Sequence, residues 1–134
     1  MADTFRFELV SPDRLLLSAD ATEVLVPGAE GEFTVLPMHA PVLSTLRPGL
    51  LDVKLEDGAE HQFFVQGGFA EVDPESLTVL AQQAIDRASL DQDWLDQQKK
   101  NAEEDLSDAT DDKARDAAQS TLDRLKLIET TLFN

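Results

Sequence analysis

The stretch from Val24 to Gly49 is crowded with turn-forming residues, and it constrains the fold more than any other part of the chain. Three glycine turns, Pro27-Gly28, Glu30-Gly31 and Pro48-Gly49, and a Leu-Pro-Met-His-Ala-Pro corner separate short apolar runs. Such pairs favour tight turns over long helices. The stretch therefore predicts stiff loops on a small β scaffold. None of its turns carries a nucleophile, a cluster of metal ligands or a phosphate-binding loop, so we interpret it as a docking surface.

The amino-terminal part of the chain reads as strands. In 4–10, Phe5, Phe7 and Leu9 alternate with polar residues, as on a strand with one buried face. Asp57-Gly58 predicts a two-residue hairpin turn, and Gly67-Gly68 predicts a bulge or a close backbone approach. Turn signals about 8–12 residues apart predict an antiparallel β-sandwich or flattened barrel of eight to ten strands in residues 1–87. The predicted strands are 4–10, 15–17, 22–26, 33–36, 42–46, 51–55, 62–65, 69–72 and 77–81.

The pattern changes to helix after Ile85, because from Ala88 onward the chain has no glycine and no proline. Ser89-Leu90-Asp91-Gln92 fits a capping box for a helix that reaches about Leu106, and 107–111 is a polar break. The second helix carries a heptad-like apolar seam. The seam consists of Ala114, Ala118, Thr121, Leu125, Ile128 and Leu132. We therefore predict an antiparallel two-helix hairpin in 88–134, either packed permanently on the sandwich or able to leave it and lie along a partner.

Charge and composition exclude several classes of protein. The formal net charge is −16, with about −10 in residues 1–87 and −6 in 88–134, so both parts repel nucleic acid and anionic lipid and favour basic or neutral partners. Cysteine is absent, which excludes disulfides and thiolate chemistry. No run approaches the ~18 apolar residues of a membrane span, and the start lacks a leader pattern. We therefore expect a cytosolic chain whose membrane link comes through another protein.

No constellation of residues supports an enzyme, so we predict no catalytic residue, no metal site and no cofactor. His39 and His61 are the only histidines, and neither lies in a recognisable motif. His61 is expected to be a solvated residue on a strand, whereas His39 is either a structural cap or an interface contact. The acidic run 105–116 lacks the glycine that a calcium loop needs at its sharp turn.

The turn-rich stretch also carries a family resemblance. V-x-V-P-G-x-x-G-E-F-x-V-L-P-x-H-A-P, followed by L-x-P-G-x-L at 46–51, resembles the epsilon subunit of the bacterial rotary F-type ATP synthase. G-G-F-A-E-V at 67–72 and T-V-L-A at 78–81 match the same family in the same order. The resemblance spans the whole chain and implies a non-catalytic subunit of the central stalk.

The resemblance also implies partners. The sandwich would bind the gamma subunit and rest on the ring of c subunits, on the cytoplasmic face of the bacterial plasma membrane. The loops that would face the ring supply the candidate contacts, with Glu32 and His39 the foremost for polar contact. These candidates are Glu30, Gly31, Glu32, Met38, His39 and Ala40. Such a subunit would couple proton-driven rotation of the ring to gamma.

Two departures from the family pattern bear on function. Most members have glycine where this chain has Met38, so we expect a different backbone at the corner. Some members bind ATP through an I/L-D-x-x-R-A motif; here Ile85-Asp86 is followed by Arg87-Ala88-Ser89, and Ser89 stands in place of the arginine. The substitution argues against an ATP site, unless Arg87 replaces the missing arginine from a different position.

In many bacterial members the hairpin can extend along gamma and inhibit ATP hydrolysis, using basic residues against an acidic segment of beta, so the resemblance implies the alpha and beta subunits as partners of the hairpin. The candidates here are Lys113, Arg115, Arg124 and Lys126. Because the hairpin is acidic, we predict weak or absent inhibition. The alternative hypothesis is a free-standing β-sandwich that binds proteins and dimerises through its helical hairpin.

Overall fold

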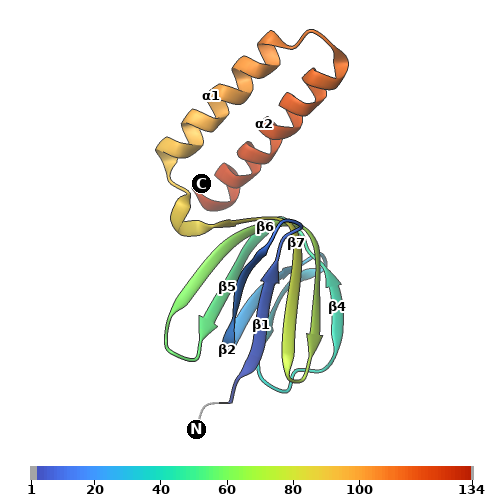
Figure 1. Ribbon diagram of the computed structural model, residues 1–134, viewed down its shortest axis with the longest axis vertical. Helices are drawn as coiled ribbons and strands as arrows, with labels where there is room; N and C mark the ends of the chain where they lie inside the picture. Colours follow the sequence, from blue (N-terminus) through green and yellow to red (C-terminus); the bar gives the residue numbers. More distant parts are fainter. Residues whose placement is uncertain (1–2, 134) are drawn as a thin grey trace. The chain divides into compact units, whose positions relative to one another are not determined.

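The computed structural model describes residues 3–133 and divides the chain into two compact units, Met1–Arg87 and Ala88–Asn134 (Figure 1). The first unit contains only β-strands, and the second contains only helices after a short 3₁₀ turn, Arg87–Ser89. We call the first unit the β domain and the second the helical hairpin. The predicted order of strands followed by helices is therefore confirmed.

Seven strands form the β domain, and five of them pair in a closed ring. The ring order is β1, β7, β6, β5 and β2, and β1 pairs back with β2. Outside the ring, β3 pairs with β2, and β4 pairs with one end of β6. The strands are β1 (Phe5–Val10), β2 (Leu15–Gly28), β3 (Gly31–Val35), β4 (Val42–Thr45), β5 (Gly49–Leu55), β6 (Glu60–Asp73) and β7 (Ser76–Asp86). The result is a barrel-like β-sandwich.

Three details of the predicted sandwich are wrong. The strand number is seven, because the runs 15–17 and 22–26 both belong to β2, and the runs 62–65 and 69–72 both belong to β6. The sheet is not wholly antiparallel, since β1 and β7 pair in parallel. The Asp57-Gly58 turn is not a two-residue loop, because Leu55 N–H donates to Ala59 C=O across three residues at 2.9 Å. Gly58 takes the positive φ (91°) that such a loop needs.

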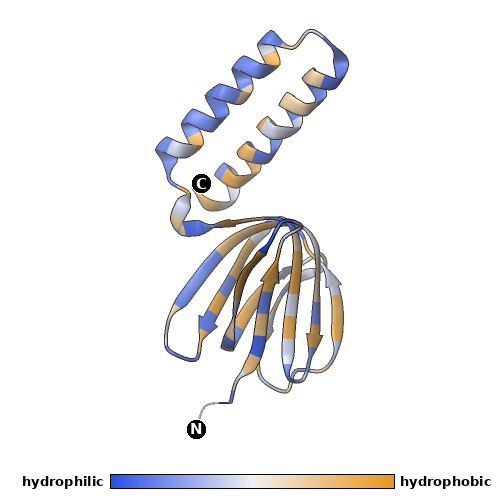
Figure 2. Cartoon of the chain, in the orientation of Figure 1, coloured by the Kyte–Doolittle hydropathy of each residue, from blue (hydrophilic) through white to orange (hydrophobic). Residues whose placement is uncertain are grey.

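Alternation along the strands builds the core. The apolar side of β1 is buried and its other side is exposed or half-buried. Figure 2 shows the alternation of hydrophobic and hydrophilic residues along this strand by its colours. The hydrophobic core of the β domain is one cluster of buried side chains. Its residues come from β1, β2, β3, β5, β6 and β7, and from Leu46, which forms a bridge to Gly28. Most of its members are Val, Leu and Phe, with alanine only at Ala21, Ala70 and Ala81.

β6 is a long strand that changes its partner on one side at Gly67-Gly68. Its first half pairs with β5, up to Val65↔Gly49, and its second half pairs with β4, from Phe69↔Thr45. The register with β7 continues unshifted through these two glycines, so the predicted close approach is present and the bulge is not. Gly68 has φ 99°, and a Cβ there would overlap the Leu80 carbonyl group. Only glycine fits at position 68 of β6.

The helical hairpin consists of α1 (Gln92–Asp108) and α2 (Asp112–Leu132). Asp91, and not Ser89, caps α1, since its carboxylate accepts the Trp94 N–H at 2.7 Å. The predicted capping box was wrong by two residues because Ser89 ends the 3₁₀ turn. Asp111 caps α2 in the same way, through Ala114 N–H at 2.7 Å.

The buried seam of α2 differs in part from the predicted one. Ala118, Leu125 and Ile128 are buried as expected, but Leu122 replaces Thr121 at the centre, and Ala114 is exposed. On α1 only Leu95 and Ala102 are buried. No helix among residues 3–133 is both long and apolar enough to cross a membrane.

Candidate docking surface

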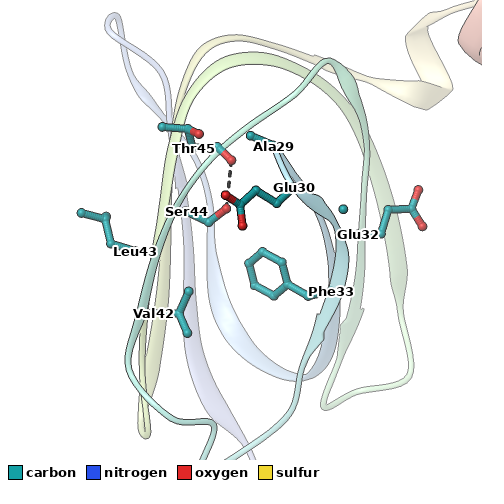
Figure 3. Close-up of a pocket in the computed structure, with 9 residues that line it drawn as sticks. Ala29, Glu30, Glu32, Phe33, Val42, Leu43, Ser44 and Thr45 are labelled. Atoms are coloured by element: carbon teal, nitrogen blue, oxygen red, sulfur yellow. Dashed lines mark hydrogen bonds between the residues drawn. The ribbon is translucent and has the colours of Figure 1, made fainter.

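A shallow groove of about 460 Å³ opens between the two strands that lie outside the ring, β3 and β4 (Figure 3). Figure 3 shows the Phe33 ring and the Glu30 side chain turned into the groove, with Val42 and Ser44 opposite. At one end Ala29 N–H donates to Thr45 C=O at 2.8 Å and joins the two walls. The groove is lined by Ala29, Glu30, Gly31, Glu32, Phe33, Val42, Leu43, Ser44 and Thr45.

The Leu36–His39 corner beyond β3 is a tight turn. His39 N–H donates to Leu36 C=O at 3.2 Å, Pro37 is the second residue, and Met38 has φ 66°. This is the pattern of a type II turn, whose third position favours glycine. Met38 is the only non-glycine residue with positive φ among residues 3–133. Met38 therefore adopts the left-handed conformation that glycine favours at this position of the turn.

The corner is tied to neighbouring segments, so it is rigid in spite of its exposure. Met38 N–H donates to Pro74 C=O in the β6–β7 turn at 2.9 Å. The His39 Nδ1 atom lies 2.7 Å from the Ala40 carbonyl oxygen, and its ring lies 6.4 Å from the Phe33 ring. The Met38 side chain is 75% exposed. The corner thus presents an apolar side chain on a fixed backbone.

The acidic candidates lie at the other end of β3. Glu30 lies in the two-residue β2–β3 turn, Ala29-Glu30, and Gly31 and Glu32 are the first two residues of β3. Figure 3 shows Glu32 pointing away from the groove, and its carboxylate lies 3.6 Å from the Arg47 guanidinium. Both side chains are about half exposed, so this ion pair contributes little to stability. The six residues predicted to contact the c ring therefore form two groups, one at each end of β3. The contact between the Phe33 and His39 side chains links the two groups.

Exposed apolar side chains add a feature that the sequence reasoning missed. Large apolar residues are exposed on β4, at Phe69 of the neighbouring β6 and in the Leu36–His39 corner, and we call them the β4 patch. The patch consists of Leu36, Met38, Val42, Leu43 and Phe69. Leu43 is the most exposed of those in strands, at 71%. A strand could be predicted here, but the sequence did not show that β4 lies at a sheet edge.

The junction and α2 hold the remaining candidates. Ile85 and Asp86 end β7, and Ser89 is exposed at the end of the 3₁₀ turn. On α2, Lys113, Arg115 and Lys126 are exposed and Arg124 is half-buried; Arg115 pairs with Asp112 at 3.3 Å. Two of these basic residues lie in the first turn, and two lie about 15 Å further along the helix. They do not form one basic cluster.

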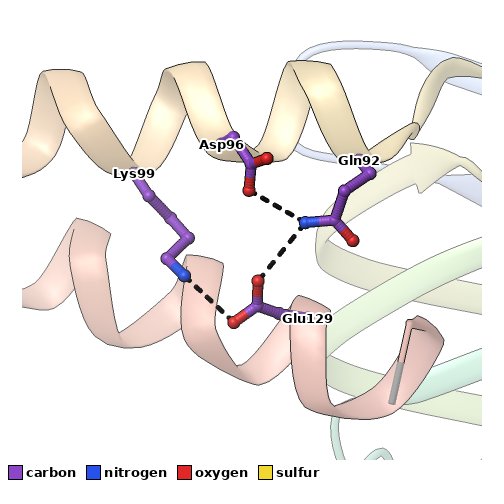
Figure 4. A network of polar contacts seen from close by, with 4 residues as sticks. All are labelled: Gln92, Asp96, Lys99 and Glu129. Carbon is purple, nitrogen blue, oxygen red and sulfur yellow. Dashed lines mark hydrogen bonds and ion pairs between the residues drawn. The ribbon is translucent and has the colours of Figure 1, made fainter.

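A polar network joins the two helices, and sequence reasoning missed it (Figure 4). Lys99 Nζ donates to Glu129 at 3.0 Å, and Gln92 Nε2 donates to Asp96 at 2.8 Å and to Glu129 at 3.4 Å. The hydrogen bond to Glu129 raises the pKa of Lys99 above that of an ordinary lysine, although desolvation opposes it. Among residues 3–133 no three or more His, Asp or Glu side chains are grouped so that they could hold a metal ion.

Comparisons with known proteins agree on one family. The profile of the ATP synthase delta/epsilon chain β-sandwich domain matches residues 4–87. The ATP synthase epsilon chain of Mesorhizobium japonicum is 45% identical over 129 residues, which is 96% of each chain. That of Parvibaculum lavamentivorans is 45% identical over 132 residues, 98% of this chain and 100% of the relative.

Two solved structures share the fold. A chain of the Euglena gracilis mitochondrial ATP synthase matches with a TM-score of 0.70 and 24% identity, covering 95% of this chain and 80% of that one. A chain of the Tetrahymena thermophila mitochondrial ATP synthase, from its central stalk and c ring, matches with a TM-score of 0.60 and 16% identity over 96% of each. The match to the family profile and the identity to the sequence relatives show that the chain belongs to the family of ATP synthase epsilon chains.

Proposed function

We propose that this chain is a non-catalytic central-stalk subunit of a proton-translocating F-type ATP synthase, where it couples rotation of the c ring to the gamma subunit. The observation that carries the proposal is its 45% identity, over nearly its whole length, to chains named ATP synthase epsilon chain. In this role it lies on the cytoplasmic face of the bacterial plasma membrane and is attached through the complex.

The β domain has the surface that this role requires. A subunit that transmits torque must present docking residues on a backbone that does not yield. The Leu36–His39 corner and the β2–β3 turn are short and hydrogen-bonded to neighbouring segments at Pro74 and Thr45. In the proposed complex the acidic side chains Glu30 and Glu32 attract basic residues of the ring, and Gly31, Met38, His39 and Ala40 supply close contact.

We propose that the helical hairpin inhibits ATP hydrolysis weakly or not at all. Its net charge of about −6 opposes insertion beside an acidic segment, and its four candidate basic residues are spread along α2. Screening limits this repulsion to near pairs, because the Debye length is about 8 Å at physiological ionic strength. Each of the four basic residues, Lys113, Arg115, Arg124 and Lys126, must therefore form its own separate contact with alpha or beta.

Purification of a tagged chain from its own cells tests the proposed assembly. The alpha, beta and gamma subunits and the c ring should be recovered with the tag. Glu32→Gln should reduce recovery of the c ring while leaving gamma, and Glu56→Gln, in the exposed β5–β6 turn, serves as the matched acidic control. Recovery of a homodimer alone would instead support the free-standing binding module.

Deletion of 88–134 tests the hairpin. In the reconstituted complex we expect hydrolysis to change by no more than about twofold, which corresponds to less than about 0.5 kcal/mol in the barrier. Activation by several-fold would show that the hairpin inhibits strongly and would overturn this part of the proposal.

A further inference from the structure

The backbone of β4 has a free edge, and its hydrogen bonds show which residues face it. Leu46 N–H donates to Gly68 C=O at 3.0 Å, so Leu46 and, by strand alternation, Ser44 and Val42 direct their backbone groups toward β6. Thr45 C=O accepts from Ala29 N–H on the opposite side. Leu43 shares this orientation with Thr45, because backbone groups two residues apart point the same way.

Leu43 N–H and C=O therefore point into the groove, away from β6. Within residues 3–133, β4 pairs with no strand but β6. The edge is only four residues long, and short edges are a common protection against unwanted pairing. The groove beside it, about 460 Å³, separates β4 from the β2–β3 hairpin. The backbone of Leu43 can accept one more strand at this position.

We propose that an extended segment of a partner subunit adds to the free edge of β4 as a further strand, an inference that rests on the proposed function. Its backbone pairs with Leu43 N–H and C=O, and its side chains alternate between the groove and the outer face. This mode of binding combines backbone hydrogen bonds, which give affinity, with side-chain contacts, which give specificity.

Charge and apolar exposure define the chemistry of the added segment. On the outer face it meets Leu43, Phe69 and Glu71, since Leu43 lies opposite Glu71 and Thr45 lies opposite Phe69. In the groove it meets Phe33 and Val42 beside Glu30. Each face therefore offers apolar side chains beside one carboxylate, Glu71 on the outer face and Glu30 in the groove. Such a surface suits a segment that contains both apolar and basic residues. A second copy of this chain, with a net charge of −16, is a poor occupant.

Hydrogen exchange of single amides tests the added strand. The Leu43 amide should exchange fast in the free chain and become at least about tenfold slower in the assembled synthase, because a new backbone hydrogen bond protects it. The Ser44 amide, already directed toward β6, is the internal control and should change little. Protection at Thr34 of β3 in place of Leu43 would overturn the proposal.

A pair of substitutions separates backbone from side chain. Leu43→Ala removes the apolar side chain, whereas Leu43→Pro also removes the N–H, and proline is tolerated where the N–H faces outward from an edge strand. We expect Leu43→Pro to weaken retention in the synthase about tenfold more than Leu43→Ala does, a factor that corresponds to about 1.4 kcal/mol. Leu15→Ala, at an exposed leucine outside the groove, should have no effect.

The outcomes distinguish this inference from the proposed function. A wild-type chain that fails to assemble with the synthase subunits would overturn both. A chain that assembles while its Leu43 amide exchanges as fast as in the free state would overturn only the added strand. Equal retention of Leu43→Ala and Leu43→Pro would do the same.

Discussion

The β domain and the helical hairpin bury their apolar residues to very different extents. The β domain has one continuous cluster of large side chains from six strands, including the fully buried Phe7 and Leu51. The buried residues of α1 and α2 are few, and two of the six are alanine, Ala102 and Ala118. Since buried apolar area is the main stabilising term, the β domain is expected to be the stable unit and the hairpin the labile one.

The hairpin also differs between its two ends. Near the start of α1 and the end of α2, Leu95, Leu125 and Ile128 are buried, and Lys99 binds Glu129. Near the connecting loop the helices are separated by an open groove of about 460 Å³ whose lining includes Ala114, Ala117 and Ala118. Small side chains leave this end loosely packed. Opening of the hairpin is therefore expected to begin at the loop.

The largest effect is expected from a substitution that destabilises the β domain and leaves the helical hairpin unaffected. In Gly68→Ala the new methyl group collides with the Leu80 carbonyl at a φ of 99°, so we expect a loss of more than about 4 kcal/mol in the free energy of unfolding. Urea denaturation measures it. Gly58→Ala is the matched control, because its φ is 91° but open space surrounds it, and about 1 kcal/mol is expected. Equal losses at the two positions would refute the steric explanation.

A pair of core truncations sharpens the comparison of the two units. Leu51→Ala in the β domain and Leu125→Ala in α2 each remove a buried leucine side chain and should each cost about 2–5 kcal/mol. In calorimetry Leu51→Ala should lower the transition of the β domain, whereas Leu125→Ala should lower only that of the hairpin. A single transition lowered by both substitutions would show that the units unfold together.

A smaller effect, and a stabilising one, is expected at the corner. Met38→Gly relieves a left-handed backbone that costs about 1–2 kcal/mol, but it adds about 0.5–1 kcal/mol of chain entropy to the unfolded state. We expect a net gain of up to about 1 kcal/mol, seen as a higher Tm for the β domain alone. Ala40→Gly, at a neighbouring exposed position without positive φ, should destabilise slightly. A lower Tm for Met38→Gly would contradict the assigned strain.

The smallest effect concerns the Lys99–Glu129 pair. Because the folded pKa of Lys99 is raised, the pair stabilises the hairpin fully below the ordinary lysine pKa and loses that contribution as the pH rises through the folded pKa. Helicity measured by circular dichroism should fall as the pH rises above the ordinary lysine pKa in the wild type. Lys99→Met should remove this extra fall, and Lys100→Met, at the exposed neighbour, should retain it.

Local patterns in the sequence predicted much of the β domain. Phe5, Phe7 and Leu9 indicated the buried face of β1, and Gly67-Gly68 indicated the close approach of two backbones. The strand number was overestimated because polar residues in the middle of β2, and Gly67-Gly68 in the middle of β6, resemble ends of strands. The parallel β1–β7 pair was missed, since it depends on contacts between residues far apart in the chain.

The docking surface was only partly predictable. Turn residues identified the segment, but the free edge of β4 follows from which strands pair, and the sequence does not reveal that choice. The cap of α1 was misplaced because Ser89 and Asp91 are both good capping residues, and the 3₁₀ turn decides between them. The left-handed Met38 follows from the type II turn, which a sequence with methionine at that position does not indicate.

The change of partner along β6 has a mechanical consequence. One unbroken chain, Glu60–Asp73, borders β5 before Gly67-Gly68 and β4 after it. A force applied to β4 is carried first by the hydrogen bonds between β4 and β6. It then passes along the covalent backbone of β6 to the half of the strand that pairs with β5. Those covalent bonds do not slip as a ladder of hydrogen bonds can, so β6 connects the β4 edge to the rest of the barrel through covalent bonds.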